Sequence, residues 1–281
     1  MNIFTSIVQC RITPAGAGDI RIEEIILEEM FDIVNESGQP TGYTVTRSLA
    51  HKKGIRHRTS HVWLVRTKDD RLQILLQKRS DTKDSHPGCY DISSAGHIPA
   101  GKDFVESALR ELYEELGVKA QPKDLVVCGQ RAFEFKETFH DEVFHDNQVS
   151  RVFLAFCDAD EDAYILQESE VSEVRWLDFD ECMELVTSNA IPHCIFTEEL
   201  EMVRETAQKL VLKERRMNLI DRAARGDIEA AADLGIAYFE GSLDVPADPE
   251  KGLKWCRYAA KRGSKRAAEA IAAAGGDSGH E

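Results

Sequence analysis

Several features common in other protein classes are missing from this sequence. Lys and Arg number 35 against 50 Asp and Glu, a formal net charge of −15 over 281 residues, so the basic surface that nucleic-acid binding needs is lacking. No stretch approaches the ~20 consecutive apolar residues of a membrane span. The N-terminus, MNIFTSIVQCRITP, has no basic region before its short apolar run, which argues against a signal peptide. We expect neither a nucleic-acid nor a membrane partner.

Cysteine also lacks a pattern. The seven cysteines are scattered and form no paired C-x-x-C metal motif. An odd, irregular number suits reduced thiols in a cytosol better than a secreted disulfide framework. With 42% apolar and 30% charged residues, the composition is that of a globular protein. We therefore expect a cytoplasmic protein, and its length favours two domains.

Local patterns divide the chain. For residues 1–29, an extra pair of edge strands and a poorly ordered extension both fit. Residues 30–196 interleave strand-like runs with a few helices, which predicts an α+β or α/β sandwich. The predicted strands lie in two hairpins, within residues 31–48 and 61–80, and near 124–135, 149–157 and 173–177, and the predicted helices lie near 103–116, 178–187 and 197–216. The helix at 197–216 would connect this domain to an Ala-rich segment, 217–281.

The most informative segment is GHIPAGKDFVESALRELYEELGV, residues 96–118. Its helix can begin after Asp103 and end at Gly117. On that helix Glu111, Glu114 and Glu115 share one face, where their like charges repel. A hard divalent cation such as Mg²⁺ or Mn²⁺ would compensate them and would suit a diphosphate substrate.

This segment resembles the signature of the Nudix hydrolases: Gly, five residues, Glu, seven residues, then Arg-Glu-apolar-any-Glu-Glu-any-Gly-apolar. The matching residues are Gly96, Arg110, Glu111, Leu112, Glu114, Glu115, Gly117 and Val118. Lys102 stands where the pattern has its first Glu. We expect Glu106, one turn before Arg110, to supply the replacement ion pair to that arginine.

The resemblance implies a Nudix α/β/α sandwich with a mixed sheet. The Ala-rich pattern of residues 217–281 predicts a small all-α segment after it. It also implies hydrolysis by a water that Mg²⁺ or Mn²⁺ activates. The implied metal ligands are the Gly96 carbonyl, Glu111, Glu114 and Glu115, and the implied catalytic residues are Arg110, Glu114 and Glu170. The general base is either Glu114 or Glu170, because its location varies across the family.

Residues 30–196 further resemble the Nudix branch related to isopentenyl-diphosphate isomerase. In that branch the substrate diphosphate is held by basic residues, which here are Arg47, Arg79 and Lys83. The resemblance also implies a second metal site at His51, His57 and His97. The two isomerising residues are replaced by Ala95 and Gln148, neither of which can move a proton on carbon. Hydrolysis is therefore favoured over isomerisation.

Within 217–281, Ala-Ala-Arg-Gly at 223–226 recurs as Ala-Ala-Lys-Arg-Gly at 259–263. The segment resembles the Sel-one-like subclass of tetratricopeptide repeats, with one full repeat between two half-repeats. Fewer than three repeats seldom stand alone. We expect the segment either to bind a protein partner or to self-associate.

Three hypotheses follow. The first is a Mg²⁺-dependent diphosphohydrolase acting on a small-molecule diphosphate, either a nucleoside diphosphate derivative or a prenyl diphosphate. The second is an isomerase of the isopentenyl-diphosphate type. The third is a non-catalytic diphosphate sensor that uses the repeat for protein contacts.

Overall fold

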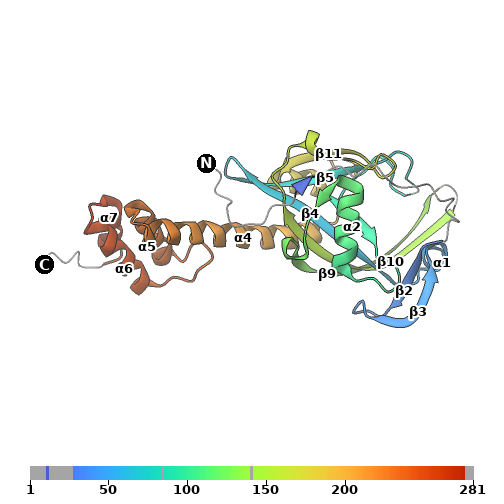
Figure 1. Ribbon diagram of the computed structural model, residues 1–281, viewed down its shortest axis with the longest axis horizontal. Coiled ribbons are helices and arrows are strands. Elements are labelled where there is room, and N and C mark those ends of the chain that lie inside the picture. Colours follow the sequence, from blue (N-terminus) through green and yellow to red (C-terminus); the bar gives the residue numbers. More distant parts are fainter. Residues whose placement is uncertain (1–10, 13–27, 84, 140–141, 276–281) are drawn as a thin grey trace. The chain divides into compact units, whose positions relative to one another are not determined.

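The computed structural model describes residues 11–12, 28–83, 85–139 and 142–275 (Figure 1). The chain divides into two compact units, one covering residues 8–206 and the other containing the helices from residue 207 on. Most of residues 1–29, for which an extra strand pair or an extension was expected, lies outside the described residues. Within that segment β1 (Arg11–Ile12) pairs with β8 (Val118–Lys119).

The first unit is built on a seven-stranded mixed sheet. Its main path runs β11-β5-β4-β10-β9, where β4 and β10 are parallel and the other pairs are antiparallel. Two short strands complete it, β6 (Tyr90–Asp91) on β5 and β7 (Ser94–His97) on β4. The main strands are β4 (His57–Lys68), β5 (Arg71–Arg79), β9 (Val126–Phe139), β10 (Glu142–Phe156) and β11 (Val171–Asp178). The predicted mixed sheet is confirmed.

Both predicted hairpins are present in the structure. Asp69 and Asp70 both adopt positive φ, 50° and 60°, in the tight turn between β4 and β5. A separate hairpin joins β2 (Met30–Val34) to β3 (Pro40–Thr46). The sequence pattern extended that second strand to residue 48, but it ends at Thr46. The Thr46 side chain instead caps a helix that the pattern missed, α1 (Arg47–Lys53).

A helix covers each face of this sheet, which confirms the sandwich. Helix α2 (Phe104–Leu116) begins after the Asp103 cap and ends at Gly117, as predicted. Its Ala108, Leu112 and Leu116 pack on one face with Val62, Leu64 and Phe153. The alternate side chains of β4 face the other side, where Trp63 donates a hydrogen bond to Glu199 of α4 (Thr197–Ala224). The remaining short elements of this unit are α3 (Phe179–Thr187), η1 (Pro122–Asp124) and η2 (Glu161–Ala163).

The second unit is entirely helical in the described residues. Helix α4 continues to Ala224 and is followed by α5 (Ile228–Glu240), α6 (Pro249–Ala260) and α7 (Lys265–Ala273) (Figure 1). Buried alanines dominate its core. Helices α5 and α6 approach so closely that a methyl group on Gly235 would lie 2.8 Å from the Cys256 nitrogen. None of the helices described is both long and apolar enough to span a membrane.

Candidate active site

One cavity in the first unit gathers most of the predicted site residues. Its volume is about 1920 Å³, and its lining comes from the box helix α2, strands β4, β5, β7, β9 and β10, and the segment around residue 170. The predicted residues on its wall are Arg47, His51, Arg79, Lys83, Gly96, His97, Arg110, Glu111, Glu114, Glu115 and Glu170. His57 lies behind this wall with no exposed surface.

Two box glutamates are buried enough to resist ionisation. Glu111 packs so closely on Gly96 that any larger residue there would overlap its carboxyl group. Burial, opposed by Arg110, raises the pKa of Glu111 to about 7. Burial raises the pKa of Glu115 to about 8, and its Oε2 accepts a 3.3 Å hydrogen bond from the Ala95 nitrogen. Each would gain a compensating charge from a cation in the cavity.

Arg110 joins two of the box carboxylates. Its Nη2 lies 2.6 Å from Glu111 Oε1, and its Nη1 lies 2.9 Å from Glu114 Oε2. The expected ion pair between Glu106 and Arg110 is wrong. Glu106 instead pairs with Lys102 at 2.6 Å, while the Arg110 guanidinium is engaged by Glu111 and Glu114. The lysine that departs from the pattern thus neutralises Glu106, and Arg110 remains free for the box.

The donor set of the box fits a hard divalent cation. Carboxylate oxygens and a backbone carbonyl are the ligands that Mg²⁺ prefers. The three glutamates line one cavity. Among the described residues, a set of three ligand atoms within 4.8 Å is found at the histidines rather than here.

The three basic residues expected to hold a diphosphate each contact a carboxylate. Arg47 Nη1 lies 3.0 Å from Glu29 Oε2, and Arg79 Nη1 lies 3.0 Å from Asp91 Oδ2. Lys83 is hydrogen-bonded to Glu170, the second candidate base. All six side chains line the cavity. A bound diphosphate would therefore compete with these carboxylates for the cations.

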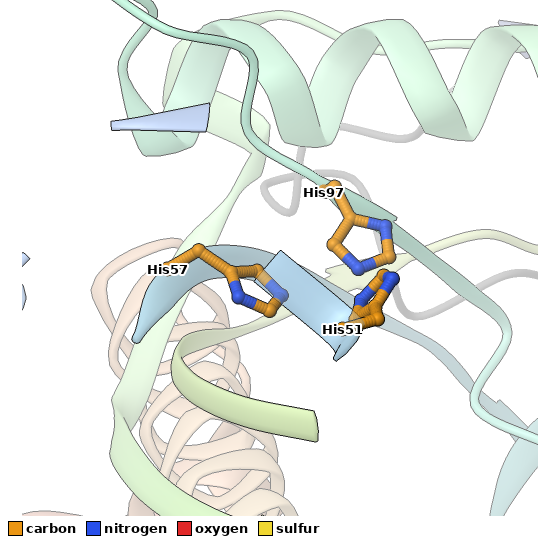
Figure 2. A group of neighbouring side chains, drawn as sticks. All are labelled: His51, His57 and His97. Carbon is orange, nitrogen blue, oxygen red and sulfur yellow. The ribbon is translucent and has the colours of Figure 1, made fainter. Parts of the chain in front are cut away.

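The three predicted histidines come together (Figure 2). One ring nitrogen from each of His51, His57 and His97 lies within 4.8 Å of the others. Burial lowers the pKa of all three, that of His51 to about 3. They are therefore neutral at pH 7, the form in which imidazole binds metals. The Nδ1 of His57 is 2.9 Å from the Ile55 carbonyl, which fixes its proton there and leaves Nε2 as a ligand atom.

Asp146 joins this cluster, and the sequence analysis missed it. Its Oδ1 lies 3.5 Å from His57 Nε2 and 3.9 Å from His51 Nε2. The Nε2 atoms of all three histidines and this Oδ1 are buried without a hydrogen-bond partner in the described structure. Buried polar atoms are rarely left so, and three imidazoles with one carboxylate suit Zn²⁺ or Mn²⁺. The available signal was position: Asp146 precedes Gln148 by two on β10, so both point to the same side.

Comparison with known proteins identifies the domain. A NUDIX domain model matches residues 55–196, and a Sel1 repeat model matches residues 228–264. An uncharacterized Nudix hydrolase of Clostridium acetobutylicum is 35% identical over 154 residues, which cover 55% of this chain and 72% of that protein. The chain belongs to the Nudix hydrolase family. As a Nudix hydrolase it acts on pyrophosphate bonds, and its C-terminus carries a Sel1 repeat, as expected.

Two further relatives and one solved structure are similar to this Nudix hydrolase. Nudix hydrolase 3 of Arabidopsis thaliana is 43% identical over 159 residues, covering 55% of this chain but only 20% of the plant protein. The uncharacterized YfcD of Escherichia coli is 33% identical over 150 residues, covering 53% of this chain and 73% of YfcD. A Deinococcus radiodurans crystal structure aligns with a TM-score of 0.46 at 19% identity, covering 62% of this chain and 98% of that one.

Proposed function

We propose that this chain is a Mg²⁺- or Mn²⁺-dependent diphosphohydrolase that cleaves a small diphosphate by attack of water on phosphorus. The observation that carries the proposal is the pair of buried carboxyl groups, Glu111 and Glu115, with raised pKa values in a cavity that also holds Arg79 and Lys83. The pair suits a divalent cation, and the two bases suit the diphosphate that the same cation would touch.

The proposed ligands are Glu111, Glu114, Glu115 and the Gly96 carbonyl. A divalent cation bound there would lower the pKa of its water and neutralise charge on the departing phosphate. Arg110 holds Glu111 and Glu114 in place through one guanidinium. Its rigid fork suits this two-sided role better than a lysine would.

The contacts of Lys83 connect substrate binding to proton removal. Lys83 is hydrogen-bonded to Glu170. When a diphosphate oxygen takes Lys83, the Glu170 carboxylate is released and can accept the proton of the attacking water. The water oxygen then bonds to phosphorus as the bridging P–O bond breaks. Glu114 is the alternative base, although its carboxylate is already paired with Arg110.

The histidine cluster supports the isopentenyl-diphosphate-isomerase-like branch and a second metal there. Its ligands would be His51, His57, His97 and Asp146, held as described above. Ala95 and Gln148 leave the site without the acid and base of isomerisation. We therefore propose that the isomerase-like frame serves hydrolysis.

The group attached to the diphosphate faces an aromatic wall. Phe133 and Phe135 of β9 and Phe144 of β10 line the cavity with ring centroids about 6 Å apart, at 6.0 Å and 5.9 Å. Such rings pack against a nucleobase or against a hydrocarbon chain. Nucleoside diphosphate derivatives and prenyl diphosphates are thus both proposed substrates, and the catalytic region is proposed as residues 30–196.

The deciding experiment is a substrate panel with Mg²⁺ or Mn²⁺, read by product identity. ADP-ribose, a nucleotide sugar, and isopentenyl and geranyl diphosphates would form the panel. We expect phosphate or nucleotide release that Glu114→Gln reduces by about 10²-fold or more, the scale of removing a key group from transition-state stabilisation. Glu106→Gln on the same helix is the matched control and should retain turnover. Tight binding without turnover in the parent protein would refute the proposal and favour a sensor.

We further propose that residues 197–216 connect the catalytic region to residues 217–281. Sel1 matches end before α7, so one full repeat carries the segment. Because fewer than three repeats seldom bury a continuous core, we propose that this segment either binds a protein partner or self-associates. Light scattering of the full chain would show which of the two applies.

A further inference from the structure

A second polar network lies on the cavity wall, apart from the box and the three histidines. His61 of β4 lines the cavity and lies opposite Ala95 of β7 in the sheet register. Its Nδ1 is 2.9 Å from Glu199 Oε1 and 3.0 Å from Oε2. Since a carboxylate only accepts, His61 Nδ1 carries the proton.

Glu199 is held in a single place. It is 1% exposed, and its Oε1 also accepts a 2.8 Å hydrogen bond from Trp63 Nε1. Arg131 Nη1 lies 3.7 Å from its Oε2. A buried carboxylate is costly unless it is paired and hydrogen-bonded. The two hydrogen-bond donors from β4, with the guanidinium charge of Arg131 on β9 nearby, satisfy that condition.

The network favours the protonated form of His61. The charged groups that act on its ring are Glu199 of α4, Asp91 of β6, Arg131 of β9 and Asp146 of β10. Burial lowers the pKa of His61, but Glu199 and Asp91 raise it by more, so the net direction is upward. The pKa of Glu199 is lowered, because His61, Trp63 and Arg131 outweigh its burial. Both directions describe one ion pair.

The second nitrogen of His61 is available to a ligand. Among the described residues its Nε2 has one polar contact, to Thr59 Oγ1 at the long distance of 3.4 Å. That hydroxyl is already engaged at shorter range, by Gln148 Oε1 at 2.8 Å and Ser150 Oγ at 2.7 Å. An imidazolium whose second N–H is weakly bonded is a strong donor to an anionic oxygen.

We propose that His61 binds an oxygen of the substrate diphosphate through its Nε2–H, and that Glu199 is the positioning residue that orients its ring through Nδ1. The inference rests on the proposed function. Its location supports it, because Ala95, across from His61, immediately precedes Gly96, a proposed metal ligand. Binding the diphosphate through His61 displaces no carboxylate, whereas Arg47, Arg79 and Lys83 must each exchange one.

The first test uses the intact protein and a probe that cannot be hydrolysed. Methylenediphosphonate with Mg²⁺ is added while the imidazole nitrogens are observed by ¹⁵N NMR, with His61→Gln used to assign the His61 signals. We expect the His61 Nε2 signal to move with saturation while Nδ1, bonded to Glu199, moves less. An unmoved His61 ring at saturation of the probe would overturn the inference.

The second test separates binding from structure. His61→Gln alone leaves Glu199 buried without its partner, so the double variant His61→Gln with Glu199→Gln is the safer one to fold. We expect its affinity for methylenediphosphonate, measured by calorimetry, to fall about tenfold, as loss of one charge-assisted hydrogen bond predicts. Glu199→Gln alone should weaken binding less and should have no added effect once His61 is replaced.

The matched control is Asp180→Asn, another ion-paired acid, whose side chain is 92% exposed and absent from the cavity wall. Its affinity should equal that of the parent protein. Unchanged affinity in the double variant, with turnover of the diphosphate panel intact, would overturn the role of His61 and leave the proposed function standing. If the parent protein binds and cleaves no diphosphate at all, the proposed function fails and the inference fails with it.

Discussion

His57 and His61 lie four residues apart on the same side of β4, and both rings are buried, yet their pKa values shift in opposite directions. The pKa of His57 is lowered, together with those of His51 and His97, whereas the pKa of His61 is raised. Each ring has a carboxyl neighbour, Asp146 or Glu199. Proximity to an acid therefore does not by itself make a histidine a cation.

The difference lies in what else holds the carboxyl group. Glu199 receives hydrogen bonds from His61 and Trp63 and faces Arg131, and its pKa is lowered. Asp146 is bonded through Oδ2 to Gln148, its Oδ1 is unpartnered, and burial raises its pKa. A carboxylate with enough donors keeps its charge and ionises its histidine. A carboxyl group without enough hydrogen-bond donors leaves the neighbouring imidazoles neutral, and neutral imidazoles can bind a metal ion.

The largest expected effect comes from breaking the hydrogen-bonded pair of His61 and Glu199. Glu199→Ala should lower the free energy of unfolding by about 3–5 kcal/mol, because it removes the acceptor of the buried N–H groups of His61 and Trp63 and the carboxylate nearest Arg131. Urea unfolding measures this change. Asp180→Ala removes an exposed partner of Arg204 and should cost about 1 kcal/mol or less. Equal losses in the two variants would contradict the role given to burial.

The next expected effect is stabilisation by a metal ion at the cluster of His51, His57, His97 and Asp146, whose buried polar atoms lack hydrogen-bond partners. Zn²⁺ or Mn²⁺ at 100 times its Kd should stabilise the protein by about 2.7 kcal/mol, as mass action requires for a ligand of the native state. His57→Gln and Asp146→Asn should each reduce that gain, read as the shift of the thermal midpoint. His145→Gln, on β10 and paired with Glu134, is the control and should keep it. A gain that survives loss of His57 would place the metal elsewhere.

The smallest effect is on pH dependence, with opposite signs for the two histidine types. The first measurement is made with a chelator that removes bound metal ions. The pKa of His51 in the native protein is lowered to about 3, so below pH 6.5 the unfolded chain binds a proton at His51 that the native protein does not bind. Native stability should thus fall on acidification, by about 1.4 kcal/mol per pH unit below 6.5 for this residue, and His51→Gln should flatten the profile.

His61 acts in the other direction. Its raised pKa contributes stability that is full below pH 6.5 and is lost as pH rises through its native value, while the lowered pKa of Glu199 contributes above its ordinary value of 4.5 and is lost at lower pH. Glu199→Gln should therefore make the protein more acid-sensitive between pH 7.5 and 5.5, measured by urea midpoints. If His51→Gln and Glu199→Gln changed the pH dependence of stability in the same direction, the comparison of the two histidine types would be contradicted.

Local features of the fold were readable because they depend on near neighbours in the chain. The cap at Asp103, the stop at Gly117 and the Asp69–Asp70 turn each act within a few residues. Helix α1 escaped because its Thr46 cap follows a good strand pattern. Helix α4 ran eight residues beyond residue 216, because nothing in that stretch ends a helix before Gly226.

The candidate site was readable where one helix carries it. Spacing along α2 decides that the box glutamates share a face, so the sequence by itself determined the family and the residues that we propose as cation ligands. The pairing within this segment was not readable in the same way. Glu106 has a basic residue four positions away on either side, and only the structure shows that it pairs with Lys102.

Only the tertiary structure decided the charge of the histidines. Asp146 reaches His57 through the parallel pairing of β10 with β4, and Glu199 reaches His61 across 138 residues of chain. Burial and the number of donors around each carboxyl group then set its ionisation. These quantities arise from packing between distant segments, so no short pattern in the sequence could express them.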